Sequence, residues 1–108
     1  MSNRLFQGII HQMGDSVNRT IGVMDDSSTV ISCSELARIG SVNGFISLDM
    51  MDLHLPFVRD GYTYKLFGNT GNPEYAVFVE GMDEVAAQFA QILAISLSNL
   101  KKYYDEKI

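Results

Sequence analysis

Hydrophobic residues recur along this chain with two different periods, and each period predicts a different kind of element. Over residues 2–16 they lie three and four positions apart, which is typical of an amphipathic helix. They form two adjacent stripes, Leu5, Ile9 and Met13 on one and Phe6, Ile10 and Val17 on the other. Gly14 with Asn18 suits the end of this helix, because both residue types tolerate the left-handed conformation that closes many helices.

The period changes to two in residues 20–33, where apolar and polar side chains alternate. Four polar residues at positions 25–28 interrupt this pattern before a second β-branched run begins at Thr29. Two such runs across a polar break predict an antiparallel hairpin, since Asp and Ser side chains can hydrogen-bond backbone amides in the turn. Ser34 is then expected to cap one short helical turn, and Gly40 to close it in a left-handed conformation.

The second half of the chain predicts helical turns followed by three strands. Apolar residues recur at every third position in residues 42–55, which favours helical turns. The dipeptide Asp60-Gly61 is a strong hairpin-turn signal, so the apolar runs on either side of it are expected to pair. Residues 68–73 have the composition of a loop. Residues 75–79 form a continuous apolar run of strand length, which predicts a central strand buried on both faces.

The final helix is expected to begin after Asp83, a favoured capping residue, and to continue to the end of the chain. Its apolar residues cover roughly 220° of a helical wheel that turns about 100° per residue. A helix lying on a sheet needs a stripe only a little wider than about 100°. The excess predicts further cover from the first helix and from a second copy of the chain. Six apolar residues are the expected contacts with that copy: Val85, Phe89, Ile92, Leu93, Leu97 and Leu100.

The elements therefore follow the order helix, two strands, short helical crossover, three strands and long helix. The compact solution for this order is an α+β fold, in which a five-stranded antiparallel sheet carries flanking N- and C-terminal helices. At 108 residues the chain has room for a single domain.

Six short segments, in order along nearly the whole chain, resemble the N-terminal sensory domain of transcriptional regulators of the sugar-diacid and purine-catabolism type. They are IGVMD at 21–25, VIS at 30–32, RIG at 38–40, DGYTYK at 60–65, EYAVFVEG at 74–81 and SLSNL at 96–100. Diacid-recognising versions usually carry a histidine shortly after the Arg-Ile-Gly motif, whereas residues 41–44 read SVNG in this chain.

The resemblance implies that residues 1–108 form a PAS- or GAF-like (profilin-like) sensory and dimerisation domain. It implies a homodimer that binds a small organic acid or another metabolite, and a C-terminal helix that leads into an effector region. The same order of elements also describes roadblock-type dimerisation domains. A scaffold module without a ligand is therefore the alternative function.

Composition and charge exclude several classes of partner. A net charge of −5 argues against binding nucleic acid or an anionic membrane through this domain. Cys33 is the single cysteine, and no signal peptide or apolar run of membrane-spanning length occurs, so a cytoplasmic protein is expected. The sequence contains no nucleophile elbow, phosphate loop or paired-histidine spacing. Catalysis, a cofactor and a metal site are consequently not expected.

Four residues are candidates for contact with a ligand: Arg38, Tyr62, Tyr64 and His54. Arg38 lies near the end of the turn after the hairpin, where a guanidinium can hold a carboxylate with two parallel hydrogen bonds. Its alternative role is an ion pair with an acidic neighbour, Glu35 or Asp26. Tyr62 and Tyr64 are two positions apart, so a strand presents both on one face, either as a pocket wall or as ordinary half-buried sheet residues.

Overall fold

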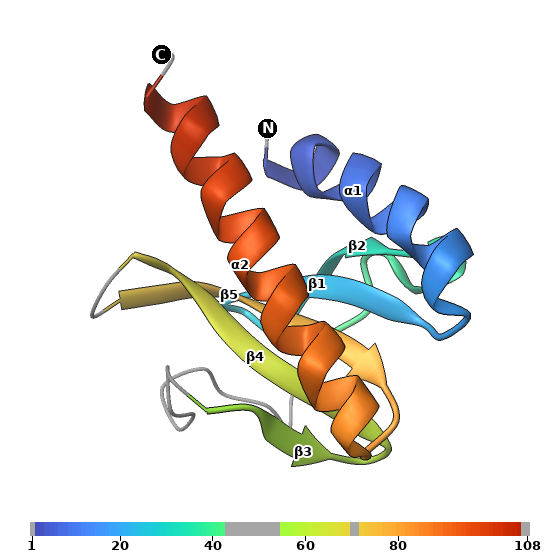
Figure 1. Ribbon diagram of the computed structural model, residues 1–108. Helices are drawn as coiled ribbons and strands as arrows, with labels where there is room; N and C mark the ends of the chain where they lie inside the picture. The colour runs from blue at the N-terminus through green and yellow to red at the C-terminus, as the bar shows by residue number, and fades with distance from the viewer. Residues whose placement is uncertain (1, 43–54, 70–71, 107–108) are drawn as a thin grey trace.

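The computed structural model describes residues 2–42, 55–69 and 72–106. The elements in these residues are α1 (Ser2–Val17), β1 (Ile21–Asp25), β2 (Val30–Cys33), the short 3₁₀ turn η1 (Leu36–Arg38), β3 (Phe57–Arg59), β4 (Tyr62–Asn69), β5 (Asn72–Glu80) and α2 (Glu84–Glu106). The two long helices lie across one face of a five-stranded antiparallel sheet (Figure 1). The predicted α+β class is confirmed. Helical turns are expected in residues 42–55, of which residues 43–54 lie outside the described part of the chain.

The sheet places β5 at its centre, in the order β2-β1-β5-β4-β3, and every neighbouring pair is antiparallel. Residues 76–79 of β5 are all buried, as their continuous apolar run predicts. Val77 and Val79 belong to the apolar cluster under the helices, whereas Ala76 and Phe78 belong to a second cluster. Because successive residues of a strand point to opposite faces, the sheet is apolar on both.

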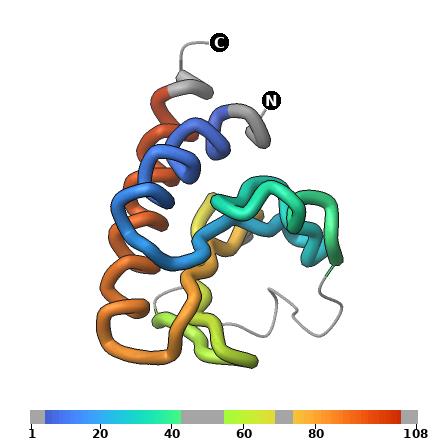
Figure 2. The backbone as a smooth tube through the Cα atoms, turned by 90° about the vertical axis from the view of Figure 1, so that its right-hand side faces the viewer, coloured from blue at the N-terminus to red at the C-terminus, as the bar shows by residue number. Residues whose placement is uncertain are grey.

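The first apolar cluster fills the space between the sheet and the two helices. α1 contributes Phe6 and Ile10, both fully buried. The Phe6 ring meets Phe67 and Tyr75 edge to face, at centroid distances of 5.5 and 5.0 Å. α2 buries five apolar residues on its inner side: Ala86, Ala90, Leu93, Ala94 and Leu97. Figure 2, turned by a quarter from Figure 1, shows both helices on the same side of the strands.

The start of α2 is held by a helix cap and an ion pair that share one carboxylate. Asp83 Oδ1 accepts a 2.9 Å hydrogen bond from the backbone N–H of Ala86, which is the capping contact that the sequence predicts. The Arg19 guanidinium donates to both oxygens of the same carboxylate, at 2.8 and 2.9 Å. Arg19 also donates to the carbonyl oxygen of Glu80, at the end of β5. These bonds join the segment before β1 to the junction of β5 and α2.

Ser34 joins the beginning of β1 to the end of β2. The prediction that Ser34 caps the helical turn is wrong, because the residue before η1 is Glu35. Ser34 Oγ accepts a 3.0 Å hydrogen bond from the Ile21 N–H, and its own N–H donates to the Ile21 carbonyl at 2.8 Å. α1 passes so close that a Cβ on Gly14 would lie 2.6 Å from the Ser34 Cβ. Gly14 thus allows this close approach from within α1. The helix ends at Val17, and the next residue, Asn18, has a φ of +58°, the expected left-handed conformation.

The hairpin of β4 and β5 is longer than its composition predicts. Residues 68–73 suggest a loop, but β4 continues to Asn69 and β5 begins at Asn72. The register shifts between Phe67 and Gly68, where Gly68 has a φ of +133°. A glycine at this irregularity lets the strand pairing continue beyond the end of the apolar pattern.

Asp83→Asn tests how far a charge stabilises the start of α2. Hydrogen bonds from Arg19 and from the Ala86 N–H hold the pKa of Asp83 well below its usual range. A lowered folded-state pKa adds stability above the unfolded-state pKa of about 4, and this stability is lost as the pH falls toward the folded-state pKa. Asn keeps the cap but not the charge, so we expect the variant to lose more free energy of unfolding at about pH 7 than at about pH 3.

Urea unfolding of the wild type and the variant at both pH values measures this difference. Asp26→Asn makes the same change at an exposed position in the β1–β2 turn and controls for the loss of one negative charge. An equal loss of stability at both pH values in Asp83→Asn would contradict the stabilising role of the Arg19–Asp83 pair.

Candidate functional site

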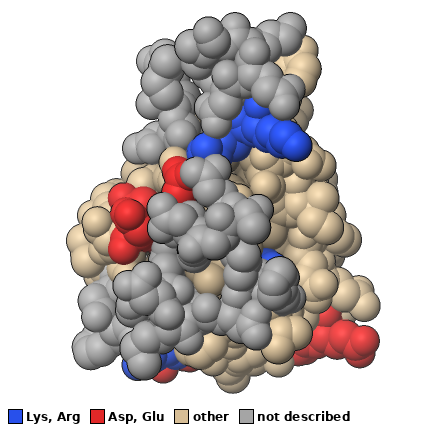
Figure 3. Space-filling view, turned by 90° about the vertical axis from the view of Figure 1, so that its left-hand side faces the viewer, with Lys and Arg blue, Asp and Glu red and all other residues tan. Residues whose placement is uncertain are grey.

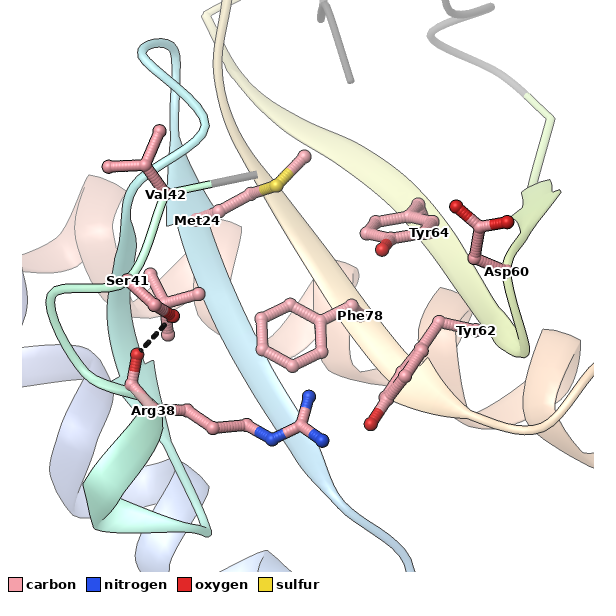
Figure 4. A pocket seen from close by; sticks show the side chains of 9 residues that line it. Met24, Arg38, Ser41, Val42, Asp60, Tyr62, Tyr64 and Phe78 are labelled. Carbon is pink, nitrogen blue, oxygen red and sulfur yellow. Dashed lines mark hydrogen bonds between the residues drawn. The ribbon is translucent and has the colours of Figure 1, made fainter. Parts of the chain in front are cut away.

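The face of the sheet opposite the helices carries a cavity of about 200 Å³ (Figure 4). Strands β1, β4 and β5 form its floor, η1 and the residues after it reach in from one side, and the β3–β4 turn lies on the other. Nine residues line it: Met24, Val30, Arg38, Ser41, Val42, Asp60, Tyr62, Tyr64 and Phe78. We call this cavity the Arg38 pocket.

Small residues in β1 and β5 leave space for the Phe78 ring at the floor of the Arg38 pocket. Gly22, Phe78 and Tyr64 are neighbours across β1, β5 and β4. A Cβ on Gly22 would meet the Phe78 ring and would lie 2.5 Å from the carbonyl oxygen of Ser32. In the adjacent row of the sheet, Ala76 occupies the central strand. The Phe78 ring can therefore occupy the space beside Gly22 because position 22 has no side chain.

Three aromatic rings line the pocket, two from β4 and one from β5. Tyr62 and Tyr64 both project from β4 into it, as their period-two spacing predicts. The Phe78 ring meets Tyr62 edge to face at a centroid distance of 5.9 Å, and it meets Tyr64 at a tilt at 6.2 Å. Tyr64 is only 5% exposed, whereas Tyr62 is half-buried. Tyr62 is thus the more accessible of the two tyrosines.

Arg38 supplies the positive charge of the pocket. Its Nε donates a 2.8 Å hydrogen bond to Glu35 Oε2, so the ion pair that the sequence suggests as an alternative is present. The guanidinium nevertheless lines the pocket, with Cζ 5.3 Å from the centre of the Tyr62 ring. Burial lowers the pKa of Arg38, but Tyr62 and Glu35 raise it by more, and the group is charged at any physiological pH.

Backbone hydrogen bonds hold the segment that carries Arg38 against β2. The N–H of Gly40 donates to the carbonyl oxygen of Val30, and the N–H of Val30 donates to that of Ser41, both at 2.8 Å. Gly40 has a φ of +94°, the left-handed conformation that the sequence predicts. Ser41 Oγ donates to the carbonyl oxygen of Arg38 at 2.6 Å (Figure 4). The backbone itself therefore positions the base of the Arg38 side chain.

The opposite side of the pocket carries a negative charge. Asp60 and Gly61 form the β3–β4 turn as predicted, with φ values of +52° and +87°. The Asp60 carboxylate lies 3.8 Å from Arg59 Nε and is 77% exposed, so this ion pair adds little stability. Figure 4 shows Arg38 and Asp60 on opposite sides of the apolar floor. The pocket can thus accept a polar group at either side.

The structure brings together three of the four residues that the sequence suggests for ligand contact. Arg38, Tyr62 and Tyr64 all line the pocket, and His54 lies outside the described residues. Sequence reasoning missed Phe78, which forms the middle of the floor. Phe78 belongs to a run that is apolar on both faces, so no alternation marks it. Its position beside Tyr64 depends on the register of β4 and β5, which the local pattern does not contain.

The residues expected to contact a second copy divide between the two sides of α2. Leu93 and Leu97 are buried, and Phe89 and Leu100 are half-buried. Val85 and Ile92 are exposed. Leu93 and Leu97 pack against the sheet of their own chain. They are core residues and do not belong to the outer surface of α2, contrary to the expectation.

A second cavity, of about 410 Å³, lies between the end of α1 and the start of β1. Its lining is mostly polar, and three of its charged groups, Arg19, Glu35 and Glu80, bond other groups of the chain. Glu80 Oε1 accepts a 3.0 Å hydrogen bond from the Thr20 N–H, and Arg19 is paired with Asp83. Ligand sites usually combine apolar walls with a few polar groups. The Arg38 pocket has that combination, and this second cavity does not.

Within residues 2–42, 55–69 and 72–106, no group of three or more His, Cys, Asp or Glu side chains is arranged to hold a metal ion. No helix in this part of the chain is long and apolar enough to cross a membrane. Cys33 is fully buried, and burial raises the pKa of its thiol. Comparisons with models of protein families, with curated proteins and with solved structures find no match.

Gly22→Ala is expected to destabilise the fold and to disturb the pocket floor. The added Cβ displaces the Phe78 ring and crowds the backbone of β2, and overpacking of this kind costs about 1–3 kcal/mol. Gly8→Ala is the matched control, because a Cβ at Gly8 meets nothing within 4 Å. In a helix this change stabilises by about 1 kcal/mol. Urea unfolding measures both effects, and a Gly22→Ala protein as stable as the wild type would rule out the close approach at Gly22.

Proposed function

We propose that this chain is the ligand-sensing domain, PAS- or GAF-like in arrangement, of a cytoplasmic transcriptional regulator, and that it binds a small organic anion in the Arg38 pocket. The observation that carries the proposal is the position of Arg38, whose guanidinium stands beside Tyr62 at the edge of an apolar cavity. The resemblance of six sequence segments to the sensory domains of such regulators supports the regulatory role. The net charge of −5 supports a domain that does not itself contact nucleic acid.

The chemistry of the pocket favours a particular kind of ligand. Glu35 engages Nε of Arg38, so the two terminal nitrogens of the guanidinium are the groups that meet a carboxylate, through two parallel hydrogen bonds. Phe78 and Met24 offer apolar surface to the rest of the ligand. A volume of about 200 Å³ is small beside typical ligand sites of about 300–1,000 Å³. A compact metabolite with one acidic group and an apolar or hydroxylated body fits best.

The same strands that line the pocket also support α2. Tyr64 and Phe78 face the pocket, and their chain neighbours Thr63 and Val79 are buried on the helix side. A ligand shifts the packing of α2 only by its difference in affinity for two arrangements of the sheet and helix. We propose that ligand binding favours one such arrangement and that α2 carries the difference to an effector region.

A scaffold or dimerisation module of the roadblock type, without a ligand, is the second candidate. The observation in its favour is that α2 exposes apolar side chains on its outer side, including Ile92 and Ile95. This candidate predicts a sheet that continues across the dimer and a pocket that binds nothing. The Arg38 pocket favours the sensory function over it.

Arg38→Gln is expected to weaken ligand binding about tenfold to a hundredfold, because a hydrogen bond to a charged group contributes about 1.5–3 kcal/mol. Isothermal titration calorimetry with small dicarboxylates, sugar acids and purine-pathway metabolites identifies the ligand and measures the loss. Arg59→Gln is the matched control, since Arg59 and Arg38 are similarly exposed, at 42% and 44%, and Arg59 does not line the pocket.

Two outcomes would reject the sensory function. Absence of binding by every compound in the three classes would leave the scaffold module as the better candidate. Equal loss of affinity in the Arg38→Gln and Arg59→Gln proteins would show that a general surface charge attracts the anion and that the pocket does not hold it.

A further inference from the structure

The outer side of α2 carries an exposed stripe that is apolar in the middle and polar toward its C-terminal end. Its six residues follow the alternating three- and four-residue spacing of a helix–helix seam: Val85, Gln88, Ile92, Ile95, Asn99 and Lys102. All six are exposed, Ile92 by 52% and Ile95 by 63%. The inner side of α2 is already buried against the sheet, so this stripe is a second, separate surface of the helix.

The outer side of α1 is different, although both helices lie on the same face of the sheet (Figure 2). Within residues 5–17, its exposed positions are polar or lack a side chain: Gly8, His11, Gln12, Asp15 and Ser16. A helix whose outer side meets only water is expected to be polar there, as α1 is. Clustered apolar residues on a surface mark contacts with other molecules. The stripe therefore indicates that the outer side of α2 has a partner.

The stripe is self-complementary under a two-fold axis midway between Ile92 and Ile95. Such an axis places Ile92 against the partner's Ile95, and Ile95 against the partner's Ile92. In the next layer Gln88 meets the partner's Asn99, and both amides can donate and accept hydrogen bonds. An interface between two identical chains requires this relation, in which each residue of a pair meets the other.

We propose that a second copy of this chain covers the stripe, with the two α2 helices antiparallel. The inference goes beyond the proposed function, in which α2 carries a signal to an effector region, and it gives the second copy expected from the sequence a direction and a register. The contact layers are Ile92 with the partner's Ile95, Gln88 with the partner's Asn99, and Val85 with the partner's Lys102. These are the layers that an antiparallel pair of helices forms from a single seam of this spacing.

Charge separates the antiparallel arrangement from the parallel one. α2 has Glu84 in its first turn and an exposed Lys102 near its other end. Figure 3 shows basic side chains in the upper part of one side of the molecule, with acidic side chains near them and others at the lower right. Antiparallel helices bring Lys102 close to the partner's Glu84, whereas parallel helices bring two copies of Lys102 together. Facing like charges disfavour the parallel pair.

Disulfide cross-linking tests both the direction and the register. We propose to prepare Gln88→Cys and Asn99→Cys separately, oxidise each alone and in an equal mixture, and identify the linked peptides by mass spectrometry. The antiparallel register predicts a link between positions 88 and 99 in the mixture and little linkage in either protein alone. Cys33 remains in both proteins because it is fully buried, and the oxidised wild type controls for its reactivity.

Gln12→Cys, on the exposed outer side of α1, controls for chance collisions. Efficient linkage of Asn99→Cys to itself would overturn the antiparallel direction. Linkage no greater than that of Gln12→Cys in all mixtures would overturn the interface as a whole.

Sedimentation equilibrium over a wide concentration range provides a second measurement. Ile92→Glu places a charge in the middle of the stripe, and we expect it to weaken self-association at least about tenfold. Leu36→Glu is the matched control, because Leu36 is 63% exposed on η1, which packs against β2. Equal association of the Ile92→Glu and wild-type proteins would overturn the proposal.

The calorimetric titration of the Arg38 pocket is independent of these measurements. Ligand binding without cross-links between positions 88 and 99 would reject the antiparallel pair and leave the sensory function intact. Cross-links without any ligand would reject the sensory function and leave the antiparallel pair in place as a scaffold.

Discussion

The central strand β5 is apolar on both faces, and the rest of the structure depends on covering both. α1 and α2 cover the face on which Val77 and Val79 lie. Ala76 and Phe78 lie on the other face, where η1 carries Arg38 and the residues after η1 line the same pocket. If one face of this antiparallel sheet were polar and exposed to solvent, the two helices alone would cover all of its apolar surface. Because the centre of this sheet is apolar on both faces, the pocket opposite the helices has an apolar floor and a charged edge.

The same constraint couples the two faces of the sheet. Phe78 points into the pocket, and its neighbours in the sequence, Val77 and Val79, pack on the helix side of the sheet. The Phe78 ring has little freedom to yield, because the backbone of Gly22 lies directly behind it. Close-packed interiors transmit displacements because they contain no free volume to absorb them. Under the proposed function, a ligand that presses on the ring would therefore act on the backbone of β5, and through it on the inner side of α2.

The parts of this structure that follow from local chemistry could be predicted from the sequence. Asp60-Gly61 forms its turn and Asp83 caps α2, because each acts on its own neighbouring backbone. Ser34 takes a partner in β1 instead of its own helical turn, and no local pattern contains that choice. The same limit applies to the pocket: the sequence suggests Arg38 and the two tyrosines, but Phe78 joins them only through strand register.

The proposed ligand and the proposed second copy would occupy opposite sides of the molecule, so neither contacts the other directly. The outer residues Ile92 and Ile95 are exposed on the same turns of α2 from which Leu93 and Ala94 enter the core. A rigid helix cannot move its inner side chains without turning its outer ones. A small rotation of α2 on the sheet would therefore displace the isoleucine layers from the two-fold axis and weaken the pair. Under these two proposals, binding in the Arg38 pocket would change the strength of self-association, because a symmetric interface tolerates little change of register.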